Sequence, residues 1–406
     1  MPTQFDENGL GKFASDSLLY QEDVISLTDK LRNDGVIPWF QAVAPLHVKF
    51  YSLSHFLFSP LTAPNILTIE PLNLVYYLAI LAIVNQLALT LFNRVTGVLA
   101  MTVLALWPSF LLHTTQLLRD PLLIVAILVL VLVIADWLNK DSVLRGSLLA
   151  TLAAAFACAT VWMVRLAMWD VVRLILLMGV VLLVIRSVRD RRFFPGPVIS
   201  VVVLSAVILL IPHWGALKSQ QRREADAGRT LIADQAAELS LWKRIGRRRQ
   251  AFADLKKDDS YASASNIDNE VTLNTMSDLV RYLPRAAAIG FFAPFPNMWF
   301  AEGSQVGRAG RLVSGLETLI TYVIELLALV GLWQMRKSLA VWLLAFTVIL
   351  GLTGLGFTVL NIGSLYRFRY PFLALMIVLA AGGIGQVLSW RAIRNEPSTR
   401  ESTVAS

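Results

Sequence analysis

The chain has 406 residues, of which 56% are hydrophobic and only 16% are charged, with a formal net charge of +8. This much apolar surface exceeds what one soluble core could bury, so the composition excludes an ordinary soluble protein and indicates a polytopic membrane protein. In such a protein an excess of Lys and Arg is typical of cytoplasmic loops, and we do not expect nucleic acid as a partner. The one cysteine, Cys158, lies in an apolar run and excludes an internal disulfide.

The first polar region, residues 1–71, contains a helical pattern. In residues 15–35, "SDSLLYQEDVISLTDKLRNDG", apolar side chains recur among acidic ones at helical spacing, and Gly35 marks a stop. We predict an amphipathic helix on the outer membrane surface, followed by a proline-rich and aromatic stretch suited to the membrane interface. No signal peptide or membrane span precedes this region. We therefore expect either a further apolar helix upstream of Met1 or an inefficiently translocated tail.

A ruler of about 20 apolar residues per membrane helix divides most of the remaining chain into spans. Nine segments qualify, several of them short: 72–92, 97–112, 121–138, 146–164, 170–186, 197–212, 312–333, 339–360 and 371–388. The predicted fold is therefore an all-α bundle of about nine transmembrane helices. Its parts are an extracytoplasmic region at 1–71, spans within 72–212, a long extracytoplasmic segment at 213–311, spans within 312–388 and a tail at 389–406.

Basic residues assign the two sides of the membrane. Alternate short connections carry Lys or Arg in phase, namely Arg94, Lys140, Arg145, Arg186, Arg189, Arg191, Arg192, Arg336, Lys337 and the tail. The positive-inside rule places these connections and the C-terminus in the cytoplasm. The loops 113–120 and 361–370 then face outward. We expect a multi-pass protein of the inner or plasma membrane.

The segment 213–311 has two dissimilar parts. Residues 214–260 are charged and predicted to be helical, and include "KRIGRRR" at 243–249. Residues 277–300 combine three prolines with clustered aromatics, which disfavours a straight span and predicts a re-entrant or interfacial element. Neither part contains a glycine-rich nucleotide loop.

Ionisable residues at membrane depth are the default functional candidates. Most gather on the predicted outer face as Arg119 with Asp120, Arg165 with Asp170, and Arg367 with Arg369. Arginine binds phosphate oxygens through two hydrogen bonds while its stem lies in apolar surroundings, which suits an anionic lipid headgroup. For any single pair, interhelical pairing is the alternative. Glu317 and Glu325 are further candidates, and for Glu325 the alternative is a role in holding helices together.

The order of these features resembles the GT-C class of integral-membrane glycosyltransferases, in particular the superfamily of protein O-mannosyltransferases, aminoarabinose transferases and bacterial surface-polysaccharide enzymes. Four stretches carry the resemblance: "DSLLY" from Asp16, "APLHVKFY", "WPSFLLHTTQLLRDPLLI" and "LNIGSLYRFRYPFLALMIVLAAGGIG". Each motif alone is common, and their order is more specific. Relative to that family, Ser17 replaces the usual Glu, and the first transmembrane helix is absent.

The resemblance implies transfer of a sugar from a polyprenyl-phosphate carrier to a glycan, lipid or protein acceptor at the extracytoplasmic face. Asp16 would be the catalytic base, with the nearby pair Asp6 and Glu7 as a rival, and Asp120 would be the second acidic position of the catalytic site, orienting the acceptor or a helper group. Donor and acceptor would be bound by Tyr20, His47, Arg119, Arg165, Arg367 and Arg369. The resemblance names no certain cofactor and leaves a divalent metal open, although the four histidines lack metal-ligand spacing. The alternatives are a polysaccharide polymerase or ligase, a transporter of lipid-linked glycans and a subunit of an export complex.

Overall fold

The computed structural model describes residues 15–62, 66–139, 144–192, 194–213, 240–254, 266–300 and 307–394. In this part of the chain the regular elements are helices, and the pairing of Asn266 with Asn361 is an isolated bridge. The helices are α1 (Ser15–Asn33), α2 (Val36–Gln41), α3 (Leu46–Thr62), η1 (Ile66–Thr68), α4 (Glu70–Leu91), α5 (Arg94–Ala105), α6 (Pro108–Thr114), α7 (Asp120–Asn139), α8 (Leu144–Val164), η2 (Leu166–Met168), α9 (Trp169–Asp190), α10 (Pro195–Leu210), η3 (Ile211–His213), α12 (Leu241–Asp254), α14 (Met276–Phe292), η5 (Pro296–Met298), α15 (Gly307–Gln334), α16 (Leu339–Thr358) and α17 (Ile362–Arg394).

The protein is an all-α polytopic membrane protein. Within the described residues six helices are long and apolar enough to cross a membrane: α4, α7, η2 with α9, α15, α16 and α17. The pair α5 and α6 qualifies only jointly and is bent by 69°, while α8 and α10 contribute shorter apolar stretches. All nine predicted segments coincide with helices, but the number of complete crossings stays a prediction.

The bend between α5 and α6 has a local cause in the sequence. Proline at position 108 is the first residue of α6, and it disfavours helical geometry at Trp107, whose ψ is 111°. The predicted single span at 97–112 is therefore two helices, which could have been inferred from "WPSF" alone.

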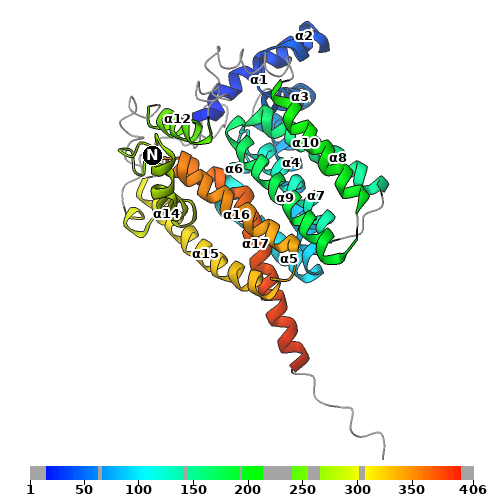
Figure 1. The fold of residues 1–406 in the computed structure, drawn as a ribbon. Helices are drawn as coiled ribbons and strands as arrows, with labels where there is room; N and C mark the ends of the chain where they lie inside the picture. The colour runs from blue at the N-terminus through cyan, green and yellow to red at the C-terminus, as the bar shows by residue number, and fades with distance from the viewer. Residues whose placement is uncertain are drawn as a thin grey trace, which may run out of the picture.

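The two ends of α7 define two ends of the bundle. This helix has 20 residues, so it is about 30 Å long, close to the hydrocarbon thickness of a bilayer. We call the end at Asp120 the Asp120 face and the end at Asn139 the Asn139 face. Figure 1 shows α1, α2, α12 and α14 gathered toward one end, whereas α17 projects from the other.

Interhelical hydrogen bonds tie the helix ends together at the Asn139 face. Asn139 donates to the carbonyl of Thr90, and Arg186 donates to that of Trp137. Arg189 donates to the carbonyl of Lys337. The predicted cytoplasmic connections therefore do meet at one end of the bundle, as their phase required, although the side of the membrane on which they lie stays a prediction.

The predicted outer loop at 361–370 is wrong, because α17 begins at Ile362 and carries Pro371 inside it. Asn361 explains the early start: its side-chain oxygen accepts a hydrogen bond from the amide of Ser364, as a helix N-cap does. The predicted span began at residue 371, but the helix starts earlier, because membrane helices tolerate an internal proline where neighbouring groups satisfy the freed backbone.

The amphipathic helix predicted at the N-terminus is confirmed as α1. Its apolar residues Val24, Leu27 and Leu31 are buried, and α1 packs against α3. Gly35 follows it with φ 89°, a left-handed conformation that glycine adopts without strain. Protein packing therefore uses much of the face that was predicted to lie on lipid.

The segment 277–300, predicted to be re-entrant or interfacial, is largely the helix α14, which packs against α16. A capping box of Thr275 and Asp278 starts α14. Its Gly290 lies against the carbonyl of Leu352, and Gly356 of α16 lies against the carbonyl of Ala286. These close approaches run along α16 in the opposite direction to α14. The chain therefore enters from the Asp120 face and turns back through η5 before α15.

Candidate functional site

The centre of the candidate site is Asp120, the first residue of α7. It is only 4% exposed, and its carboxylate accepts a 3.0 Å charge-assisted hydrogen bond from Arg165. The guanidinium of Arg367 lies 4.0 Å from its other oxygen. Asp120 thus pairs with arginines from two distant segments, whereas the sequence had grouped it with its neighbour Arg119.

Arg165 occupies the short turn between α8 and η2, where it is 7% exposed. Its guanidinium lies 3.2 Å from the ring centroid of Phe368 on α17. This is a cation–π contact, in which the face of the aromatic ring attracts the positive charge. The same residue therefore joins α7, α8 and the first turns of α17. Asp170, its predicted partner, pairs instead with Arg244 and Arg248 of α12.

A second group of predicted residues meets this centre from the N-terminal region. Tyr20 of α1 and His47 of α3 contact each other edge to face, with ring centroids 4.6 Å apart. Arg165 interacts electrostatically with Tyr20, Arg119, Asp120 and Arg367. The structure thus brings together six predicted site residues, from Tyr20 on α1 to Arg367 on α17.

His47 is the member of the group whose polar atoms lack protein partners. It is 1% exposed, and neither ring nitrogen makes a hydrogen bond with a described residue. Burial, and secondarily the positive charge of Arg119, lower the pKa of His47 well below its ordinary value, so the ring is neutral. A buried polar group without a hydrogen bond costs about 1–3 kcal/mol. A bound ligand or water that supplies one would recover that cost.

The loop that carries Arg119 is held by Tyr51, which the sequence did not single out. Its hydroxyl donates a 2.7 Å hydrogen bond to Asn73 and lies 3.2 Å from the carbonyl oxygen of Leu118. Tyr51 is fully buried on α3, one turn after His47. A tyrosine in an apolar interfacial stretch gives no sequence signal of this role.

Hydrogen bonds beside the site account for the candidate Glu317 and for His113. The carboxylate of Glu317 accepts a 2.8 Å hydrogen bond from the amide of Ser109 at the start of α6. Nδ1 of His113 lies 2.6 Å from the carbonyl of Ser109 and 2.9 Å from the hydroxyl of Tyr370. A carbonyl only accepts, so Nδ1 carries the proton. Glu317 and His113 therefore fasten α6 to α15 and α17.

Arg369 lies outside the group. Its guanidinium donates to the carbonyls of Gly290, Phe291 and Ala293, where α14 ends. Helix C-termini present unsatisfied carbonyls, and a cation there is stabilising. Residues two apart on a helix point in different directions, so Arg367 and Arg369 could share a site only if the segment were not helical. The structure places Arg367 with Asp120 and leaves Arg369 to support α14.

The predicted base, Asp16, is in the first turn of α1, four residues before Tyr20, but its side chain lies outside the described residues. The rival pair Asp6 and Glu7 lies outside them as well. The role of Asp16 as the base therefore stays a prediction. Its support is that Asp16 lies one helical turn before Tyr20 on α1, and Tyr20 contacts His47.

The basic stretch at 243–249 lies within α12, which packs on the bundle. Arg244 and Arg248 each hold the carboxylate of Asp170 at 3.0 Å. Arg249 donates to the carbonyls of Asp268 and Phe357. The charged helix predicted between 214 and 260 is confirmed over Leu241–Asp254, and residues 214–239 lie outside the described chain. Arg244, Arg248 and Arg249 therefore make structural contacts with the bundle.

Among the described side chains, no group of three or more His, Cys, Asp or Glu is placed to hold a metal ion. In comparisons with known proteins, no family model, no curated protein and no solved structure matches this chain.

Proposed function

We propose that the protein is a membrane glycosyltransferase that transfers a sugar from a polyprenyl-phosphate carrier to a glycan, lipid or protein acceptor. The observation that carries the proposal is the convergence of Arg119, Arg165 and Arg367 around buried Asp120, at the end of a membrane-spanning helix. Guanidiniums at the level of lipid headgroups match a phosphate attached to a hydrocarbon tail. The proposal places this face outside the cytoplasm.

The chemistry divides among the residues by their position. The acceptor hydroxyl attacks the anomeric carbon while the bond from that carbon to the phosphate oxygen breaks, and the hydroxyl proton passes to the carboxylate of Asp16. The arginines stabilise the negative charge on the departing polyprenyl phosphate. Asp120 acts through Arg165 and Arg367, whose guanidiniums it orients. A ring nitrogen of His47 binds a sugar or acceptor hydroxyl, because it has no described protein partner.

Two variants test this division of roles. Asp16→Asn should retain binding of a polyprenyl-phosphate sugar and lose turnover, since only the proton acceptor is removed. Arg367→Gln should weaken donor binding by roughly tenfold or more, the effect of one charge-assisted hydrogen bond of about 1.5–3 kcal/mol. Arg336→Gln is the matched control, because Arg336 is an exposed arginine beyond α15 whose guanidinium contacts Trp333. Normal turnover in Asp16→Asn would exclude the assigned base, and normal donor binding in Arg367→Gln would exclude the phosphate site.

A further inference from the structure

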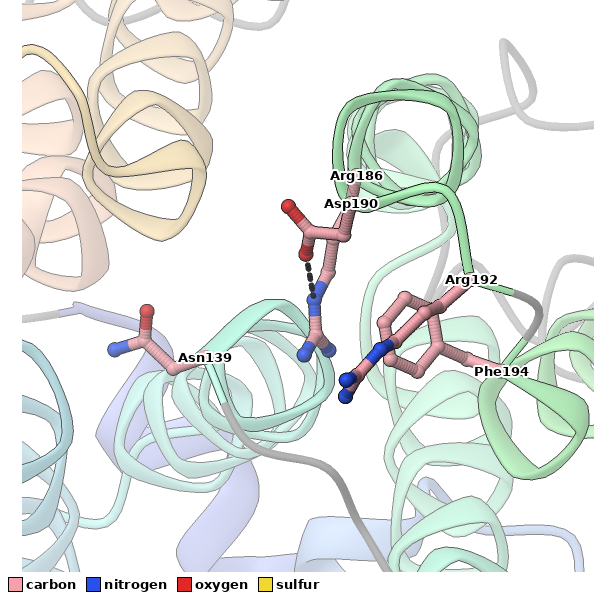
Figure 2. A pocket seen from close by; sticks show the side chains of 5 residues that line it. All are labelled: Asn139, Arg186, Asp190, Arg192 and Phe194. Atoms are coloured by element: carbon pink, nitrogen blue, oxygen red, sulfur yellow. Dashed lines mark ion pairs between the residues drawn. The ribbon is translucent and has the colours of Figure 1, made fainter.

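A separate hollow opens at the Asn139 face, at the far end of the spanning helices from Asp120. It has a volume of about 470 Å³ and is lined by Asn139, Arg186, Asp190, Arg192 and Phe194. Figure 2 shows these side chains coming from the end of α7, the end of α9 and the start of α10. The hollow therefore lies where three apolar helices reach the membrane boundary.

Arg186 is fixed in the wall of this hollow. It is 5% exposed, donates a 2.6 Å hydrogen bond to the carbonyl of Trp137 and lies 3.5 Å from the carboxylate of Asp190. Its guanidinium lies 4.0 Å from the ring centroid of Phe194. A charged group held in this way loses little conformational freedom when a ligand binds, so the site is preorganised.

Arg192 approaches the same space from the chain reversal after α9. Arg191 adopts the left-handed conformation, with φ 50°, and turns the chain at the end of the helix. Figure 2 shows the guanidinium of Arg192 beside that of Arg186, on the side away from Asp190. With the described residues the side chain of Arg192 makes no hydrogen bond or ion pair, and it is exposed.

Among the described residues that line the hollow, positive side chains outnumber negative ones. Two guanidiniums face one carboxylate, and that carboxylate also accepts a 3.0 Å hydrogen bond from Arg189. Like charges side by side repel unless an anion lies between them. The surroundings are apolar as well: Ile185, Val188 and Val198 on the same helices are 37–73% exposed, as lipid-facing residues are.

We propose that this hollow binds the phosphate group of an anionic ligand, with oxygens shared between Arg186 and Arg192. Arginine matches phosphate geometry through paired N–H donors. Basic pockets between membrane helices are suited to the headgroups of anionic phospholipids, and a soluble phosphate ester offers the same oxygens. The exposed apolar side chains favour the lipid source. The proposal is independent of the chemistry at the Asp120 face.

Native mass spectrometry of the intact protein tests the site, with phosphatidylglycerol and phosphatidylcholine as probes and glycerol 3-phosphate as a soluble competitor. Wild type should retain phosphatidylglycerol in preference to phosphatidylcholine, and Arg192→Gln should reduce that retention by roughly tenfold or more. Arg336→Gln removes the same charge at the same face, and it should leave retention unchanged. Because Arg192 is exposed, its replacement should leave the thermal unfolding midpoint of the protein in place.

The outcomes separate the two sources of phosphate. Loss of phosphatidylglycerol in Arg192→Gln without competition by glycerol 3-phosphate assigns the site to lipid. Displacement by glycerol 3-phosphate at comparable concentration assigns the same site to a soluble phosphate ester. Equal retention of both lipids by wild type, or an equal loss in Arg192→Gln and Arg336→Gln, overturns the proposal.

Discussion

Replacing Asp120 by asparagine tests whether the site is held together by charge. The substitution keeps the shape of the side chain but leaves Arg165, which is 7% exposed, without its carboxylate partner. At an effective dielectric constant of about 20, unit charges 3.0 Å apart attract by about 5.5 kcal/mol, and those 4.0 Å apart by about 4 kcal/mol. Desolvation and repulsion between the arginines offset part of this. We expect Asp120→Asn to lower the free energy of unfolding by about 3–5 kcal/mol, the usual cost of breaking a buried ion pair.

The assay is equilibrium unfolding of the purified protein in mixed micelles, with a double variant as the control. Asp120→Leu combined with Arg165→Met removes both charges and fills similar space, which is often close to neutral for a buried pair. The double variant should therefore be more stable than Asp120→Asn. A loss below about 1 kcal/mol in Asp120→Asn, or a double variant no more stable than the single one, would refute the electrostatic reasoning.

Three further predictions concern packing, titration and docking. Gly356→Ala would drive a methyl group into the carbonyl of Ala286 and should lower the free energy of unfolding by about 1–3 kcal/mol, whereas Gly354→Ala, whose nearest neighbouring atom is 4.0 Å away, should be neutral or stabilising in the same unfolding assay. Because the pKa of His47 is lower in the folded protein, the unfolded chain takes up the proton first, so the free energy of unfolding should fall as the pH drops below about 6.5; His47→Gln should show a weaker dependence, and an unchanged one would contradict the assignment. Asp170→Asn removes the carboxylate that holds two arginines of α12, so amide hydrogen exchange across Leu241–Asp254 should become faster, and unaltered exchange would show that other contacts dock this helix.

Hydropathy and charge phase predicted the architecture, because membrane helices must satisfy their own backbone hydrogen bonds. Each of the nine apolar runs coincides with helical residues in the described chain, although the run at 97–112 is two helices, and Arg186 and Arg189 were correctly grouped at one end. The errors lie where short-range signals compete. The last span was predicted to begin at residue 371, whereas Asn361 caps a helix that begins at Ile362, and Arg367 and Arg369 therefore point in different directions.

The candidate site could be predicted as a set of residue types but not as a set of partners. Ionisable residues near helix ends identified Asp120, Arg165 and Arg367, yet their pairing depends on helix packing that no local pattern encodes. Tyr51 was missed because its hydrogen bond to Asn73 spans two helices. Arg244 and Arg248 were expected on a charged external helix, but only the structure shows that Asp170 is their partner.

The most direct test of the central claim is a structure of the protein in lipid with polyprenyl phosphate bound. The account predicts the phosphate at the Asp120 face, within hydrogen-bond distance of Arg165, Arg367 or Arg119, with the prenyl chain leaving toward the hydrocarbon. A polyprenyl phosphate bound elsewhere, with its phosphate remote from these three guanidiniums, would contradict it.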